Sequence, residues 1–334
     1  MSKLTKSEKS RRDMIKKSIH EHNNCKENTC RSYVISLSKL MGRYEILTNK
    51  SVRTIAFLKD YKNVIKSLPE KLTTKKNTVT AILVILRHNK KMENIYKKYR
   101  EYSSVLRKQY DKFIQSHEKS DKQRENWVSW KKLLEIQKEY ATMIKEKHYN
   151  KKKELTKKQF FLLQDYVLVS LYTLEQPYRA EYADVRITTM KDYNKISAIE
   201  KQKNNWLIVK SRNSKWFWFM KYKTQTKFKN LKIMVESKLN TVLNLWLRFN
   251  RRPEDEKNWW LLYNTSLKKM SGNNLIKALQ RVFSGTGKRI SVNMLRHIYA
   301  TEGGQLKDVD IDKLVKDARD MKHSVQTHLN YIKK

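Results

Sequence analysis

The stretch MLRHIYATEGG, residues 294–304, sets an arginine within the apolar face of a predicted helix. Ile298 and Tyr299 follow Leu295 at helical spacings of three and four, and the three residues form an apolar stripe. Arg296 lies within this stripe. The Arg296 guanidinium is therefore expected to point toward the protein interior. A charge removed from water without a partner costs several kcal/mol. A buried Arg296 therefore indicates that an anion binds its guanidinium in the interior.

The length of the chain favours two domains. At 334 residues it is longer than a typical single domain. Hydrophobic residues make up 39% of it and aromatic residues 10%, which is enough apolar material for each domain to bury a core. Global disorder is therefore not expected.

The net charge is the strongest compositional signal. Lysine and arginine number 74 against 33 aspartate and glutamate residues, which gives a formal charge of +41. Self-repulsion on this scale opposes compaction unless a polyanion neutralises it, and nucleic acids and anionic membranes are the common polyanions. Because the basic residues run through the whole chain and are not gathered in one amphipathic helix, the expected partner is nucleic acid and not a membrane.

Hydropathy also argues against a membrane protein. The longest apolar runs, such as AILVIL at 81–86, are far too short for a transmembrane helix. The basic start MSKLTKSEKSRRDMIKK lacks the apolar segment of a secretion signal. An intracellular location is therefore expected, wherever the partner nucleic acid resides.

One segment raises the question of a metal site. IHEHNNCKENTC, residues 19–30, contains the potential zinc ligands His20, His22, Cys25 and Cys30. Structural zinc sites usually space their ligands as Cys-x2-Cys or His-x3–5-His, and this segment has neither spacing. We therefore expect a polar connection here, with no metal and no cofactor.

The pattern of apolar residues changes along the chain. Up to about residue 147 they recur at spacings of three and four, which predicts helix after helix. The stretch KEKHYNKKKELTKK, residues 145–158, has almost no apolar content and is typical of a linker. The predicted boundaries are a basic N-terminal arm over 1–26, a helical domain over 27–147, a basic linker over 148–158 and a second domain over 159–334.

The second domain is predicted to combine helices with short strands. An apolar helix over 159–174 precedes four strand-like segments, and helical periodicity returns from Glu236 onward. The fold class predicted for the whole chain is therefore mainly α with a small antiparallel β-sheet. The four strand-like segments are VRITTM at 185–190, NWLIVKS at 205–211, KWFWFMKYKT at 215–224 and KNLKIMV at 229–235.

Three separated stretches together suggest a function. They are PYRAEYADVRI at 177–187, MLRHIYATEGG at 294–304 and KHSVQTHLNY at 322–331. This order of an arginine, a Leu-Arg-His helix, a His-Ser turn and a tyrosine resembles the catalytic signature of the tyrosine recombinases, the phage-integrase family. Within this family, the sequence resembles the divergent integrases that viruses and mobile elements carry. The motifs cover about 155–334, while 27–150 resembles the family's DNA-clamping domain by architecture only.

The resemblance implies a role for each matching residue. Breaking a DNA phosphodiester without metal requires a nucleophile, cations that stabilise the transition state and a proton for the leaving 5′ oxygen. Two arginines suit the second task, because a guanidinium stays protonated and binds two phosphate oxygens at once. The implied roles are phosphate clamp for Arg179 and Arg296, phosphate hydrogen bond for His323, nucleophile for Tyr331, and general acid for Lys223 or, as second choice, Lys227.

Two positions depart from the family pattern. Where the family usually has histidine, three residues before the second arginine, this chain has Asn293, which can hydrogen-bond a phosphate but cannot take a proton at neutral pH. If Tyr331 requires a general base, it must then be another group, His297 or His323; the remaining alternative is that there is none. The acidic residue expected three positions after Arg179 is absent, and Glu181 lies one position early.

The implied function is therefore a site-specific recombinase or integrase that cuts and rejoins double-stranded DNA through a 3′-phosphotyrosyl intermediate, as a homotetramer on two DNA sites. The same chemistry fits a type IB topoisomerase-like enzyme that nicks and closes DNA as a monomer. Asn293 also leaves open a relative that binds DNA without catalysis.

Overall fold

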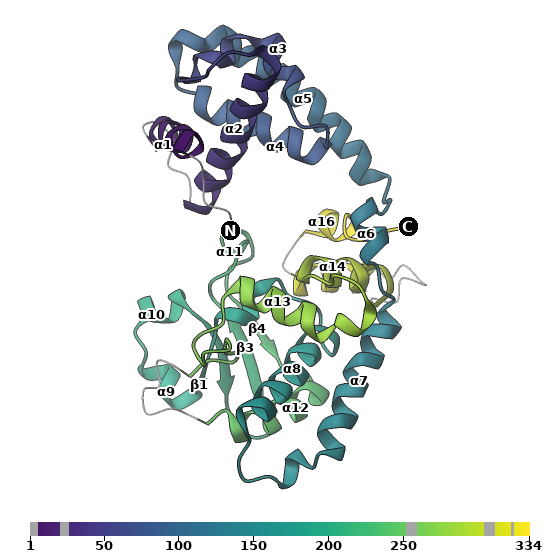
Figure 1. Ribbon diagram of the computed structural model, residues 1–334. Coiled ribbons are helices and arrows are strands. Elements are labelled where there is room, and N and C mark those ends of the chain that lie inside the picture. Colours follow the sequence, from purple (N-terminus) through teal and green to yellow (C-terminus); the bar gives the residue numbers. More distant parts are fainter. Residues whose placement is uncertain (1–5, 21–26, 252–258, 304–310, 322–323) are drawn as a thin grey trace. The chain divides into compact units, whose positions relative to one another are not determined.

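The computed structural model describes residues 6–20, 27–251, 259–303, 311–321 and 324–334. The chain forms two compact units, Met1–Ser116 and His117–Lys334 (Figure 1). The elements of the first unit are all helices in its described residues. Its elements are α1 (Lys6–His20), α2 (Glu27–Thr48), η1 (Ile55–Lys59), α3 (Tyr61–Lys66), α4 (Leu72–Leu86), η2 (Lys90–Met92) and α5 (Glu93–Gln115).

The core of the first unit forms where α2, α4 and α5 bury their apolar stripes against one another. Met41 on α2 and Ile82 on α4 are fully buried, as their helical spacing predicted. Tyr99 on α5 is buried as well, and its hydroxyl donates to the carbonyl of Leu58 at 3.0 Å. A buried phenol that finds an acceptor adds specificity to an otherwise apolar core.

The segment predicted as a basic arm over 1–26 is partly a helix of this core. On α1, Ile15 and Ile19 are buried, while Arg11 forms an ion pair with Glu45 of α2. The isoleucines are four residues apart, so they lie on one face of α1 and pack on α2. The abundance of basic residues in this segment concealed its apolar face.

The second unit combines helices with one sheet. Across the described residues of both units, no helix is long and apolar enough to cross a membrane. The elements of the second unit are α6 (Asp121–Asn126), α7 (Trp130–Glu146), η3 (Tyr149–Lys151), α8 (Lys157–Thr173), η4 (Ala180–Asp184), β1 (Val185–Thr189), α9 (Met190–Lys195), α10 (Ala198–Lys203), β2 (Asn205–Val209), β3 (Lys215–Phe219), α11 (Gln225–Phe228), β4 (Leu231–Met234), α12 (Ser237–Phe249), α13 (Gly272–Val282), η6 (Ser284–Thr286), α14 (Val292–Ile298), η7 (Tyr299–Gly303), α15 (Ile311–Asp320) and α16 (Val325–Leu329).

The units divide between Ser116 and His117, ahead of the linker predicted over 148–158. Leu133 on α7 and Tyr149 in η3 are both fully buried in the core that also contains α8. The apolar stripe of α7 therefore joins it to the second unit. The linker was predicted from its many lysines, and this composition gave no indication that Tyr149 is buried in the core.

The sheet lies where the four strand-like segments were predicted, in the order β1-β2-β3-β4. Strands β2, β3 and β4 pair antiparallel, but β1 pairs parallel with β2. The sheet is thus mixed, which corrects the prediction of an antiparallel sheet. The physical reason is the crossover through α9 and α10, which returns the chain to the starting end of β1 before β2 begins.

Alternate residues of the strands serve two different cores. Leu207 and Phe217 face the main core with α8 and α12, whereas Trp206 and Trp218 face a smaller cluster with Tyr193 of α9. This period of two follows from the pleat of a strand. Tyr193 of α9 therefore covers part of the second face of the sheet, where its ring packs edge-on against Trp206 and Trp218.

After α14 the helix widens into the π-turn η7. This turn packs closely against the residues around Trp130, and we call the contact the η7 junction. The Glu302 carboxylate accepts from the Trp127 indole N–H and from the Trp130 backbone N–H, both at 2.7 Å. The Trp130 and Tyr299 rings meet edge to face with centroids 5.2 Å apart. A Cβ on Gly303 would lie 2.8 Å from Tyr299 and 3.0 Å from Trp130, so only glycine fits there.

Gly303→Ala is expected to lower the free energy of unfolding by about 1–3 kcal/mol, because the added methyl group overpacks the two rings. Urea unfolding followed by tryptophan fluorescence measures this change. Gly285→Ala is the control, since a Cβ there meets nothing within 4 Å. Equal unfolding midpoints for the two variants would show that the junction widens at no cost.

Candidate active site

Arg296 on α14 is 1% exposed, which confirms that this arginine faces the interior. Its Nη1 donates to the carbonyl of Pro177 at 2.7 Å and its Nη2 to the carbonyl of Met321 at 3.0 Å. Pro177 follows α8 and Met321 follows α15, so one guanidinium joins segments far apart in the sequence. Burial lowers the pKa of Arg296, although the nearby Tyr331 raises it.

Local sequence fixes where this arginine lies. The Ser291 side chain accepts from the Met294 N–H at 3.2 Å and so begins α14 one turn before Arg296. Leu295 and Ile298 are both fully buried and hold the inner face of the helix against the core. The cap and the apolar stripe together direct the guanidinium inward.

Tyr331 lies against Arg296. The Arg296 Cζ is 4.9 Å from the centroid of the Tyr331 ring. Tyr331 follows the short helix α16, which begins at the cap formed by Ser324, and its N–H donates to the carbonyl of His328 at 2.8 Å. The structure thus brings together the second predicted clamp arginine and the predicted nucleophile.

The electrostatics of this contact favour ionisation of the tyrosine. Burial of the Tyr331 phenol raises its pKa, but the charges of Arg296 and Arg179 and their hydrogen bonds outweigh burial, so the pKa of Tyr331 lies below its ordinary value. A phenol with a lowered pKa is a more readily activated nucleophile.

Arg179 is the third member of this cluster. It is half-buried at the start of η4, and its carbonyl accepts from the Tyr172 hydroxyl of α8 at 2.8 Å. The Arg179 Nη1 is buried, and within the described residues it has no hydrogen-bond acceptor. A buried guanidinium N–H without an acceptor is suited to an anionic ligand.

Glu181 takes the place of the acidic residue expected after the first arginine. It is 8% exposed. Burial lowers the pKa of Arg296, and the negative charge of Glu181 opposes part of that decrease. Tyr182, which occupies the expected position, is instead a core residue, because its ring packs edge-on against Tyr172 and Phe217 at 5.4 and 5.3 Å. The acidic group has thus moved one position along the 3₁₀ turn η4.

Of the other predicted site residues, the structure gives the element and the exposure of Lys223 and Asn293. Lys223 is exposed in the connection between β3 and β4, which is the hairpin position that the resemblance implied. Asn293 is exposed on α14. His323 and the Lys227 side chain lie outside the described residues.

His297 also contacts Tyr331. Its Nδ1 lies 2.9 Å from the Tyr331 carbonyl, and the two ring centroids are 4.7 Å apart. Burial lowers the pKa of His297 to about 4, so its imidazole is neutral at pH 7. His328, 2% exposed, has a pKa of about 4 for the same reason.

His117 contacts the same segment and was not predicted. Its Nδ1 lies 3.2 Å from the carbonyl of Ile332. No sequence signal could have found it, because the two residues lie far apart in the chain and meet through backbone atoms.

No group of three or more histidine, cysteine or acidic side chains that could hold a metal ion occurs in the described ranges. The prediction for the segment 19–30 falls largely outside them, since His22, Cys25 and the His20 side chain are not described.

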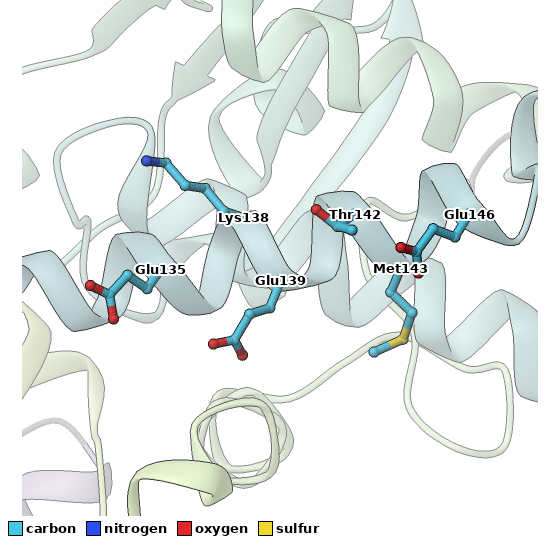
Figure 2. A pocket seen from close by; sticks show the side chains of 6 residues that line it. All are labelled: Glu135, Lys138, Glu139, Thr142, Met143 and Glu146. Atoms are coloured by element: carbon cyan, nitrogen blue, oxygen red, sulfur yellow. The ribbon is translucent and has the colours of Figure 1, made fainter.

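A shallow hollow along α7 does not belong to the cluster around Arg296. Its lining comes from successive turns of this one helix, and Figure 2 shows the carboxylates of Glu135 and Glu139 on one side of α7 and the Lys138 side chain on the other. Lys132 forms ion pairs with two of these carboxylates, Glu135 at 3.4 Å and Glu139 at 3.6 Å. We interpret the hollow as a solvated helix face. Its lining residues are Glu135, Lys138, Glu139, Thr142, Met143 and Glu146.

No protein-family model matches the chain, and no curated protein matches its sequence. Among solved structures, it is similar to the XerH site-specific recombinase bound to palindromic difH substrate in a post-cleavage complex. The TM-score is 0.54, with 97% of this chain and 91% of that chain covered at 14% identity. The chain has the fold of a site-specific recombinase.

This recombinase fold confirms the predicted fold class, apart from the mixed pairing in the sheet. At 14% identity the likeness concerns the fold alone. The evidence for chemistry is the arrangement of Arg179, Arg296 and Tyr331 in this chain.

Arg179→Gln is expected to raise the pKa of Tyr331, because it removes one of the two charges that stabilise the phenolate. The pKa is measured as the difference between ultraviolet pH titrations of each protein and the same protein carrying Tyr331→Phe. Arg212→Gln, at an exposed position between β2 and β3, is the control and leaves the difference curve unchanged. A Tyr331 titration that Arg179→Gln does not shift contradicts the described electrostatics.

Proposed function

We propose that this protein is a site-specific DNA recombinase that cuts and rejoins DNA through a 3′-phosphotyrosyl intermediate. The observation that carries the proposal is the contact of the Tyr331 phenol with the buried Arg296, beside a second guanidinium with an unmet donor on Arg179. A tyrosine next to two arginines combines a nucleophile with a phosphate-binding pair.

In the proposed reaction, Arg179 and Arg296 bind the two non-bridging oxygens of the scissile phosphate. The Tyr331 hydroxyl gives its proton to a solvent water molecule and its oxygen attacks phosphorus, so an oxygen–phosphorus bond forms as the bond to the 5′ oxygen breaks. Lys223, on the β3–β4 connection, supplies the proton that the leaving 5′ oxygen takes up. Attack of a 5′ hydroxyl on the phosphotyrosine then reverses these steps and reseals the strand.

The partners of Arg296 fit this role. It donates to the carbonyls of Pro177 and Met321, which orient the guanidinium without cancelling its charge as a carboxylate would. The full positive charge is then available to the transition state of phosphoryl transfer. The same charge lowers the pKa of Tyr331, which reduces the demand for a general base and accommodates Asn293 at the position where the family usually has histidine.

We infer that the partner is double-stranded DNA. The net charge of +41 requires a polyanion, and the XerH structure with the similar fold contains a DNA substrate. The resemblance to integrases further supports a homotetramer that joins two DNA sites and the movement of a viral or mobile element as its task. By the same resemblance the first unit would clamp the duplex.

Wild-type protein is expected to form a covalent adduct with a suicide DNA substrate nicked beside the cleavage site, because the short 5′ fragment diffuses away before resealing. Tyr331→Phe should bind this DNA and form no adduct, as judged by denaturing electrophoresis. Tyr166→Phe, at another half-buried tyrosine, is the control that should react. An adduct that persists in Tyr331→Phe would contradict the assignment of Tyr331 as the nucleophile. A separate assay for the exchange of strands between two DNA sites distinguishes a recombinase, which exchanges them, from a topoisomerase-like enzyme, which does not.

Tyr331 is expected to react with the phosphate bound by its own chain, since it already contacts Arg296 of that chain. Mixing Tyr331→Phe with Arg179→Gln should therefore yield no adduct, because neither chain has a complete site. Each variant mixed with wild type provides the control for assembly. Adduct formation in the mixture of the two variants would show that the tyrosine acts between protomers.

A further inference from the structure

The segment that begins at Tyr331 is hydrogen-bonded residue by residue to other parts of the second unit. Its partners lie on α14, on the π-turn η7 and at the first residue of the unit. Such a series of bonds fixes a backbone more tightly than the packing of a single side chain. The bonds are His297 Nδ1 to the Tyr331 carbonyl at 2.9 Å, His117 Nδ1 to the Ile332 carbonyl at 3.2 Å, the Lys333 N–H to Thr301 Oγ1 at 2.9 Å, and the Lys334 N–H to the His117 carbonyl at 2.9 Å.

The chemistry of these bonds assigns a tautomer to both histidines. A carbonyl oxygen can only accept, so the proton lies on Nδ1 in His297 and in His117. Burial keeps the His297 imidazole neutral, with its pKa at about 4, and Nε2 is then the unprotonated nitrogen.

We propose that His297 and His117 are positioning residues for the nucleophile, and that together they hold the carbonyls of Tyr331 and Ile332 so that the Tyr331 phenol rests against Arg296. This inference rests on the proposed function, because it assigns both residues a part in the attack by Tyr331. Neither imidazole touches the reacting atoms, so each acts through the backbone of the tyrosine segment.

The need for such anchors follows from the length of α16. Val325–Leu329 is a helix of five residues, too short to be stable through its own hydrogen bonds. A reacting group must be held within about 0.5 Å of its productive position. Tertiary hydrogen bonds on the far side of Tyr331 therefore supply the rigidity that the helix lacks.

His117 is suited to this task by its backbone as well as its ring. Its φ of 56° is left-handed, and this conformation places its Nδ1 and its carbonyl on the same segment, which they bond at Ile332 and Lys334. Lys119 adds a bond to the Lys334 carbonyl. Because His117 is the first residue of the second unit, it ties the nucleophile to the connection that follows α5.

The experiment separates positioning through Nδ1 from base catalysis through Nε2. The side-chain nitrogen of asparagine superposes on Nδ1 of histidine, whereas that of glutamine superposes on Nε2. His297→Asn should retain single-turnover adduct formation on the suicide substrate within about tenfold of wild type, while His297→Gln should lose roughly 100-fold, the cost of a misplacement near 1 Å. DNA affinity should be the same for both variants.

Faster adduct formation by His297→Gln than by His297→Asn would overturn the proposal in favour of a base at Nε2. Equal rates for the two variants would overturn it as well, since the Nδ1 donor would then have no special part. Unfolding midpoints of the two variants identify any loss that comes from misfolding.

His117 has its own matched pair. His117→Asn and His117→Asp both tolerate a left-handed backbone, but only asparagine keeps a donor for the Ile332 carbonyl. His117→Asp should slow adduct formation about tenfold relative to His117→Asn. The same pair at His148, an exposed residue with a φ of 50°, controls for the backbone and should give two equal rates. Equal rates for the two His117 variants would remove His117 from the proposal.

Amide hydrogen exchange tests the anchors without catalysis. Exchange at Lys333 and Lys334 should accelerate in His297→Gln and His117→Asp and stay slow in the two asparagine variants. Should wild type form no adduct, the proposed function fails, and this exchange pattern alone decides whether the histidines hold the segment. Unchanged exchange in all four variants would overturn the inference.

Discussion

The candidate site in the second unit is built around one buried cation. Arg296 is buried in the second unit, and the cost of its desolvation is offset by the carbonyls of Pro177 and Met321 and by the face of the Tyr331 ring. Because these groups come from the segments after α8, after α15 and after α16, the charge cannot be satisfied until all three have packed. Folding and assembly of the candidate site are therefore the same event.

The sheet supplies the rigid side of this arrangement. Its inner face packs on α8 and α12, and Tyr182 joins that core through contacts with Tyr172 and Phe217. The 3₁₀ turn η4 is thereby fixed between α8 and β1, with Arg179 at its start and Glu181 buried within it. The tyrosine that occupies the expected acidic position thus anchors the turn, while the neighbouring Glu181 is buried beside it.

The opposite side of the site is held by weaker elements. Short helix α16 packs through the buried His328, and the residues that follow it are hydrogen-bonded to His297, His117 and Thr301. The two arginines thus lie on well-packed elements, whereas the tyrosine lies on a segment placed by a few discrete bonds.

The sequence by itself determined the secondary-structure types, the four strand positions and the inward direction of Arg296, because apolar periodicity is a local property. That Arg296 and Tyr331 share a site was an expectation from the resemblance to the tyrosine recombinases, and the contact itself is tertiary. Only the tertiary structure decided the division at Ser116, the parallel pairing of β1 and the contacts of His117 with the end of the chain. Each of these depends on which distant surfaces meet: α7 is amphipathic wherever it packs, a strand pattern carries no direction, and a backbone carbonyl leaves no mark in the sequence.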